Sequence, residues 1–158
     1  MPTAKSVRPA KITLRELSWE EMPSILPLLQ VLNPKLTKPV FLARLKKMKP
    51  LGYRAVVASD GKKMVGLSGF WMWTRFWCGT HLDIDNFVVH PDYRDQKVGD
   101  KLVQWLEKTA LKEKADLMVL DVYAENHRAQ RFYFRSGFVA TGKHFTKIPG
   151  STMPYGHP

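Results

Sequence analysis

Two runs rich in β-branched and aromatic residues, 53–58 and 64–73, are separated by a short connection that contains Ser59, Asp60, Gly61 and Lys62. An Asp-Gly pair between such runs is the strongest short-range signal for a β-hairpin, because both residues tolerate the left-handed backbone that a tight turn requires. The chain therefore has to fold around at least one antiparallel pair of strands.

The order of the other elements indicates the fold class. Apolar alternation and helical spacing predict, in chain order, strand 11–17, a helix capped by Ser18 and ending at Leu32, helix 39–49, the two hairpin strands, strand 81–89, helix 98–114, strand 117–123, helix 126–135 and strand 138–146. This order is β-α-α-β-β-β-α-β-α-β, with antiparallel strands first and strand–helix–strand units later. We therefore expect an α/β (α+β) fold with a mixed, mostly antiparallel sheet flanked by helices.

Length and composition favour one domain. A chain of 158 residues, 44% of them hydrophobic, suits a single compact core. We expect a flexible leader at 1–10, a domain at 11–147 and a C-terminal tail at 148–158. No apolar run approaches the ~20 residues that cross a bilayer, so no membrane partner is expected. Cys78 is the only cysteine, which rules out an internal disulfide and favours the reducing cytoplasm.

The net charge of +11, from 25 Lys and Arg against 14 Asp and Glu, favours anionic partners or simply a solvated basic surface. The one dense basic cluster is formed by Arg44, Lys46, Lys47 and Lys49. Because no recognisable binding motif accompanies it, nucleic acid is not the expected partner. A basic nucleic-acid-binding module is kept only as an alternative.

The segment from Asp85 to Leu102 carries the most specific signal. A strand ends at a proline, a short polar loop with a glycine follows, and an amphipathic helix begins. Such a turn directs unpaired backbone N–H groups outward at the helix N-terminus, where an anion can bind. Arg94, Lys97 and Lys101 add positive charge around it. A pyrophosphate would suit this loop.

This segment resembles the acetyl-CoA loop of the GNAT (GCN5-related N-acetyltransferase) superfamily. The pattern Val-x-Pro-x-x-Arg over 89–94, with Gly99 and the helix after it, is the first match. The second is Ala-x-x-Phe-Tyr-x-x-x-Gly-Phe over 129–138, preceded by Asn126. One departure stands out, because Lys97 occupies the place of the usual first glycine. A left-handed backbone there would cost a lysine on the order of 1 kcal/mol.

The resemblance implies an N-acetyltransferase with acetyl-CoA as co-substrate, no metal, and direct attack by a primary amine in a ternary complex. It also implies that the strand before the loop, the loop itself and one asparagine bind acetyl-CoA, namely Phe87, Val88, Val89, Arg94, Asp95, Gln96, Lys97, Val98, Gly99, Asp100 and Asn126. For Asn126 the alternative is a helix cap. A non-catalytic CoA-binding sensor of the same fold is a further alternative, suggested by Lys97.

Three residues are candidates for catalysis. A leaving thiolate needs a proton, and the phenol of Tyr133, with a reference pKa of about 10, can supply one; its alternative is packing beside Phe132. Asp83 and Asp85 lie two apart on a strand and hence on one face. Asp85, with Asp83 second, is the candidate base for the amine proton, and both could instead orient a cationic substrate.

The acceptor amine is left open by the sequence. The family usually completes the acceptor site with the segment that corresponds here to 20–49. The aromatic strand 70–73 serves core or dimer packing, or walls the acceptor pocket. The basic surface favours a neutral or acidic acceptor over a polyamine. His81, His90 and His127 have no metal-ligand spacing and are expected to be solvated or loop-bound.

Overall fold

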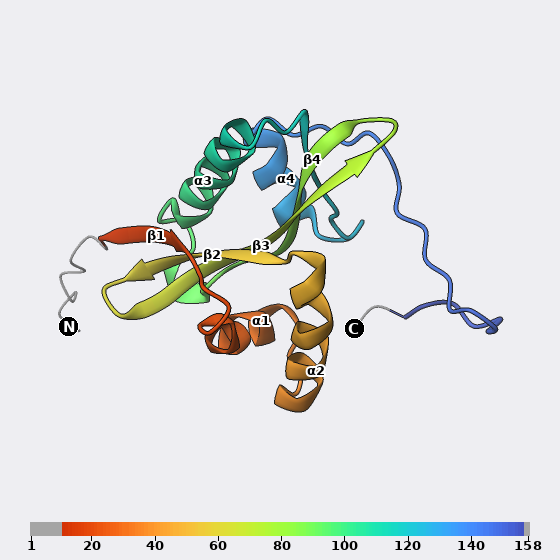
Figure 1. Ribbon diagram of the computed structural model, residues 1–158, viewed down its shortest axis with the longest axis horizontal. Coiled ribbons are helices and arrows are strands. Elements are labelled where there is room, and N and C mark those ends of the chain that lie inside the picture. The colour runs from red at the N-terminus through yellow and green to blue at the C-terminus, as the bar shows by residue number, and fades with distance from the viewer. Residues whose placement is uncertain (1–10, 157–158) are drawn as a thin grey trace, which may run out of the picture.

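The computed structural model describes residues 11–156 (Figure 1). The strands are β1 Ile12–Glu16, β2 Arg54–Asp60, β3 Lys63–Arg75, β4 Gly79–Val89 and β5 Leu117–Leu120. The α-helices are α1 Leu26–Leu32, α2 Lys38–Met48, α3 Val98–Lys112 and α4 His127–Arg135, with 3-10 turns at Met22–Ile25, Lys49–Leu51 and Pro91–Tyr93. The leader expected at 1–10 lies outside the described residues.

The five strands form one sheet in the order β1-β2-β3-β4-β5. The pairs from β1 to β4 are antiparallel, and β5 runs parallel to β4. The expected hairpin joins β2 to β3, with Gly61 in the left-handed region at φ 58°. The mixed, mostly antiparallel sheet that the sequence predicts is therefore confirmed.

Helices cover both faces of this sheet, α1 and α2 on one side and α3 with α4 on the other (Figure 1). The core is accordingly divided in two. One cluster packs Met22, Ile25 and Phe41 against strand residues such as Val57, and the other packs Leu102 and similar residues of α3 against the opposite face. The amphipathic helices predicted from apolar spacing thus bury their apolar faces on the sheet.

A bulge in β4 changes the direction of its side chains. Leu67 of β3 pairs with Val88, and Gly69 pairs with Asp85, so one residue of β3 opposes two of β4. Asn86, inside the bulge, has φ 51°. Before the bulge the even-numbered residues of β4 face α3, and after it the odd-numbered ones do. Asp85 and Asn86 consequently both lie on the α1–α2 face, which simple alternation forbids.

Three expectations about the elements are wrong. The strand predicted at 138–146 does not form; the segment is largely exposed and pairs with no described strand, and a strand does not persist without a ladder partner. Strand 117–123 ends at Leu120. The first helix has no Ser18 side-chain cap and begins as a 3-10 turn at Met22, because the Glu21 carboxylate instead pairs with Arg15 and accepts the Ser18 N–H.

None of the described helices is long and apolar enough to span a membrane.

Candidate active site

The site begins where β4 separates from β5. Their parallel ladder ends at Ile84 and Leu120, so the backbone beyond Ile84 has no described strand partner on that side. His90 donates its N–H to the Val65 carbonyl of β3 at 2.8 Å. Alternation along the strand then turns the N–H groups of Val89 and Phe87 away from β3, toward the open edge. These are donors that a ligand can use.

The loop after β4 leads into α3 through two strained residues. Asp95 and Lys97 have φ of 62° and 60°, a region that non-glycine residues rarely occupy. Lys97 is the N-cap of α3, and its side chain caps no backbone N–H. The first-turn N–H groups of α3 therefore lack a capping acceptor and remain open to an anion. Lys97 thus has the left-handed backbone that the sequence analysis considered for this position.

Replacing Lys97 with glycine is expected to stabilise the protein by about 1 kcal/mol, because glycine adopts the left-handed conformation without a steric penalty. In thermal unfolding this corresponds to a rise in Tm of about 2–4 °C for a chain of this size. Acetyl-CoA affinity should be equal or tighter, since the Cβ no longer crowds the loop.

The matched control is Lys114→Gly. Lys114 also has a positive φ, of 56°, but follows the other end of α3. It should give a similar Tm gain and no change in acetyl-CoA affinity. If Lys97→Gly weakens binding instead, the Lys97 ammonium is a ligand of the phosphates rather than a strained residue.

Helix α4 closes the same region. The Asn126 side chain accepts the Ala129 N–H at 3.1 Å and caps the helix, so the capping alternative for Asn126 holds. The Arg128 guanidinium lies 3.4 Å from the Asp95 carboxylate and ties α4 to the loop. A Cβ on Gly99 would stand 3.1 Å from the Phe132 ring, so glycine allows α3 and α4 to approach closely.

Tyr133 lies where α4 packs against β4. Its side chain is 9% exposed, and its ring contacts Phe87 of β4 as well as Phe132 and Phe138. Burial raises the pKa of Tyr133 above its ordinary value. Its hydroxyl makes no hydrogen bond to another described residue, which leaves the O–H free to donate to a bound group. The packing alternative and the catalytic one are therefore compatible.

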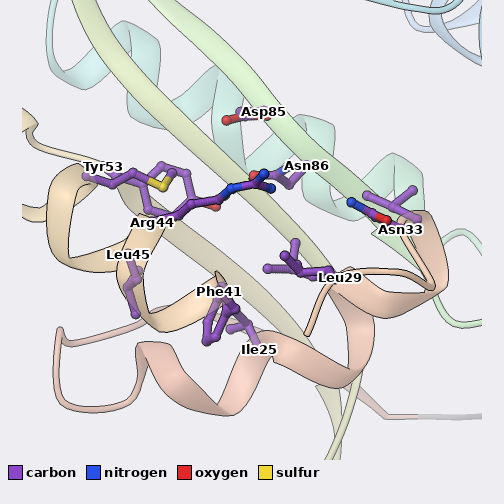
Figure 2. Close-up of a pocket in the computed structure, with 12 residues that line it drawn as sticks. Ile25, Leu29, Asn33, Phe41, Arg44, Leu45, Tyr53, Asp85 and Asn86 are labelled. Carbon is purple, nitrogen blue, oxygen red and sulfur yellow. Dashed lines mark hydrogen bonds between the residues drawn. The ribbon is translucent and has the colours of Figure 1, made fainter. Parts of the chain in front are cut away.

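A pocket of about 210 Å³ opens on the opposite face of the sheet (Figure 2). Its wall is mostly apolar and comes from α1, α2 and the bulge of β4: Ile25, Leu29, Leu32, Asn33, Leu36, Phe41, Arg44, Leu45, Met48, Tyr53, Asp85 and Asn86. Helices α1 and α2 belong to the segment where the resemblance locates the acceptor site. The pocket has few polar or charged lining residues, namely Asn33, Arg44, Tyr53, Asp85 and Asn86. A mostly apolar wall with a few polar groups is typical of small-molecule sites.

Asp85 is the acidic group of this pocket. Desolvation by burial raises the pKa of the carboxyl, while the hydrogen bond from the Trp71 indole N–H, at 3.2 Å, acts in the opposite direction. A carboxylate whose pKa is raised is a better proton acceptor at neutral pH. The neighbouring Asn86 accepts the Tyr53 hydroxyl at 3.2 Å, and any side chain at Gly69 would collide with that hydroxyl.

Asp83 occupies the same face, as predicted, but does not line the pocket. It is partly buried, and desolvation followed by the charge of Asp121 raises its pKa. Its neighbour His81 corrects an expectation. The imidazole is fully buried rather than solvated, with Nδ1 3.5 Å from the Cys78 thiol and Nε2 lacking a hydrogen-bond partner in the structure.

Several pocket residues escaped the sequence analysis. Nothing in the sequence indicates that Tyr53 and Asn86 meet, because their contact depends on the β4 bulge. Arg44 was seen only as part of a basic cluster. The available signal was its spacing, since it lies on one helical face with Phe41, Leu45 and Met48. Across residues 11–156, no group of three or more His, Cys, Asp or Glu is arranged to hold a metal ion.

Comparisons with known proteins agree with this geometry. The model of the Acetyltransferase (GNAT) family matches residues 12–138. The aminoalkylphosphonate N-acetyltransferase of Salmonella typhimurium is 37% identical over 71 residues, which are 45% of this chain and 44% of that protein. The chain thus matches less than half the length of this relative.

Solved structures share the fold. The aminoglycoside N-acetyltransferase AAC(6')-Iy, in complex with CoA, superposes with a TM-score of 0.78 at 15% identity, over 92% of this chain and 99% of that chain. Glucosamine-6-phosphate N-acetyltransferase from Arabidopsis thaliana superposes with a TM-score of 0.69 at 20% identity, over 88% of this chain and 99% of that one. At such identities the likeness concerns the fold alone.

Proposed function

Because this chain belongs to the acetyltransferase (GNAT) family, we propose that it transfers the acetyl group of acetyl-CoA to a primary amine while both substrates are bound. The observation that carries the proposal is the β4 bulge. It joins an acceptor-sized pocket containing Asp85 to the open strand edge that starts at Phe87. An amine and a thioester bound on these two sides would meet at one strand.

The reaction requires two proton movements. The amine nitrogen forms a bond to the acetyl carbon as the carbon–sulfur bond breaks, so the nitrogen loses a proton and the CoA sulfur leaves as a thiolate that gains one. Asp85 is the proposed acceptor of the amine proton, directly or through water, since its burial favours the protonated form. Asp83, outside the pocket, is the second candidate.

Tyr133 is the proposed donor to the thiolate. Its raised pKa keeps the hydroxyl protonated at neutral pH, and its O–H has no competing partner among the described residues. A hydrogen bond aimed at the developing negative charge on sulfur would be stronger at this buried position than in water. The contact with Phe87 places the ring beside the strand edge proposed to hold the thioester.

Acetyl-CoA supplies the activated acetyl group, and the chain's unpaired donors fit its shape and charge. The proposed ligands of the pantetheine arm and thioester carbonyl are the backbone groups of Phe87, Val88 and Val89. The loop from Arg94 through Asp95, Gln96, Lys97, Val98 and Gly99 to Asp100 would hold the pyrophosphate at the start of α3. Asn126, as the α4 cap, would contact the pantetheine arm only in addition to that role.

The remaining parts of the proposal concern setting and partners. Residues 11–147 would form the acetyltransferase domain, acting in the cytoplasm, which the single Cys78 favours. The acceptor of the Salmonella relative is, by its name, an aminoalkylphosphonate; here we propose a primary amine of small size. A homodimer is included because apolar side chains such as Val139 and Phe145 are exposed in the segment 138–146, and light scattering would measure it.

Calorimetric titration with acetyl-CoA, and with CoA alone, tests the function. We expect micromolar binding that weakens as salt rises, because phosphate contacts are screened, followed by amine-dependent thiol release in an acceptor screen. Binding without release for any amine would favour the non-catalytic sensor. Absence of binding at millimolar ligand would mean that the Lys97 loop is closed to acetyl-CoA.

A further inference from the structure

Arg44 occupies an unusual position on α2. Phe41 and Met48, three and four residues from it, and the adjacent Leu45 form the face that packs on the core and lines the pocket. A fourth member of such a face is normally apolar, yet here it is a guanidinium. Lys46 and Lys47 are exposed, as Arg44 is, but they do not line the pocket. Arg44 is therefore the basic residue of this helix that belongs to the pocket wall.

The Arg44 side chain is directed across the pocket. Figure 2 shows it extending from α2 toward Asn86, on the strand that also carries Asp85. No ion pair joins Arg44 to any carboxylate of residues 11–156, whereas Arg15, Arg54 and Arg128 each have an acidic partner. Arg44 is exposed to solvent, so an incoming ligand can reach it.

Asp85 and Arg44 do not neutralise each other. They line one pocket, but no salt bridge links them, and Arg44 is not among the groups that shift the pKa of Asp85. The Asp85 carboxylate is held instead by the Trp71 indole. Two oppositely charged groups, one on α2 and one on β4, thus line one small cavity without forming an ion pair.

We propose that the acceptor is a small amino acid-like molecule, with its amine at Asp85 and an anionic group bound by Arg44. A planar guanidinium binds a carboxylate or phosphonate through two parallel N–H donors, which fits either anion. This inference rests on the proposed function, because it assigns the acceptor of that reaction.

The size and lining of the pocket restrict the rest of the acceptor. At about 210 Å³ the cavity is smaller than the ~300–1,000 Å³ of typical ligand pockets. Its apolar wall, including Leu29 and Phe41, suits a short hydrocarbon body between the two charged ends. A large polycationic acceptor would leave Arg44 facing like charge, which is unfavourable. The chemistry therefore selects a compact zwitterion.

The test compares acceptors that differ only in the anionic group. We would measure acetylation of 3-aminopropanoate against propylamine, and of 4-aminobutanoate and 3-aminopropylphosphonate against butylamine, with wild type, Arg44→Gln and Lys47→Gln. We expect the anionic acceptors to be preferred by wild type. Arg44→Gln should lower their kcat/KM by about 10- to 100-fold, chiefly through KM, as expected for loss of a charged hydrogen-bond pair. The plain amines should change less than about twofold.

Lys47→Gln is the matched control, because it removes the same charge from an exposed position of the same helix. It should leave both series nearly unchanged. Equal losses for the two variants would reduce Arg44 to a long-range charge effect, and preference for the plain amines would overturn the inference. The ratio of phosphonate to carboxylate acetylation identifies which anion the pocket prefers.

Calorimetric binding of the same acceptors in the presence of CoA separates this inference from the proposed function. If no amine is acetylated but the zwitterions bind and Arg44→Gln weakens that binding, catalysis fails while the recognition stands. If amines are acetylated without regard to Arg44 or to the anionic group, the function stands and the recognition is wrong. Absence of zwitterion binding to wild type also overturns it.

Discussion

Replacing Tyr133 with phenylalanine is expected to lower kcat by about 100-fold or more, the usual contribution of a positioned proton donor. Acetyl-CoA affinity should stay within about twofold, since the ring and its contacts with Phe87, Phe132 and Phe138 are retained. Stability should change little, because the hydroxyl that is removed has no hydrogen-bond partner among the described residues. Steady-state kinetics, calorimetry and thermal unfolding check the three expectations.

The raised pKa of Tyr133 decides how the hydroxyl would act. A thiol has a reference pKa of about 8.5, which is lower than the pKa of a phenol whose pKa is raised by burial. Complete proton transfer is therefore uphill, and the catalytic gain comes from a hydrogen bond that strengthens as charge develops on sulfur. Because the donor form persists through neutral pH, kcat should not fall on the alkaline side until well above pH 8.

A second tyrosine supplies the control for this substitution. The Tyr93 hydroxyl donates to Asp60 at 3.1 Å, in the turn after β4. Tyr93→Phe should cost stability, through a lost hydrogen bond, but not kcat. If Tyr133→Phe retains the wild-type kcat, Tyr133 is a packing residue and the thiolate is protonated by water.

The sequence predicted those features that depend on local rules. Period-two alternation predicted that Asp83 and Asp85 share one face of their strand. In the structure Leu82 and Ile84 pack toward α3, so both aspartates lie on the other face. The turn residue Gly61 and the cap Asn126 were also readable, because each satisfies a short-range backbone requirement. The resemblance singled out Lys97 as standing where the family usually has a glycine, and the structure gives this residue a left-handed backbone, with φ 60°.

The features that escaped prediction depend on distant partners. The β4 bulge brings Asn86 beside Asp85 and toward Tyr53, 33 residues away in the chain, and no local signal marks it. The segment 138–146 has strand propensity, but it meets no described strand, so propensity alone misled. His81 looked like a surface residue because the short, polar context of its strand gave no sign that its ring is buried.

Replacing Asp85 with asparagine is expected to separate activity from stability. If the carboxylate accepts the amine proton, kcat should fall by about 100- to 10,000-fold. The acidic limb of the pH–rate profile, where Asp85 loses activity on protonation, should disappear with it. The Trp71 indole can still donate to the asparagine oxygen, so the pocket wall should remain in place.

Stability should change in the opposite direction, and only at neutral pH. Because burial raises the pKa of Asp85 above the reference value of 3.8, the folded state binds its proton more tightly than the unfolded state. Stability is therefore fullest below the unfolded pKa and declines as the pH rises through the folded pKa. Asparagine does not ionise, so the variant should have a higher Tm than wild type at pH 7 and lose that advantage near pH 4.

Asp83→Asn is the comparison that gives this result its meaning. Desolvation also raises the pKa of the Asp83 carboxyl. Asp83 is less buried than Asp85, however, and lies outside the pocket. It should show a smaller stability gain and nearly unchanged kcat. A large loss of kcat for Asp83→Asn with little for Asp85→Asn would move the base to Asp83. A neutral-pH Tm gain in Asp85→Asn without any loss of kcat would mean that the buried charge orients the ammonium and that water removes its proton.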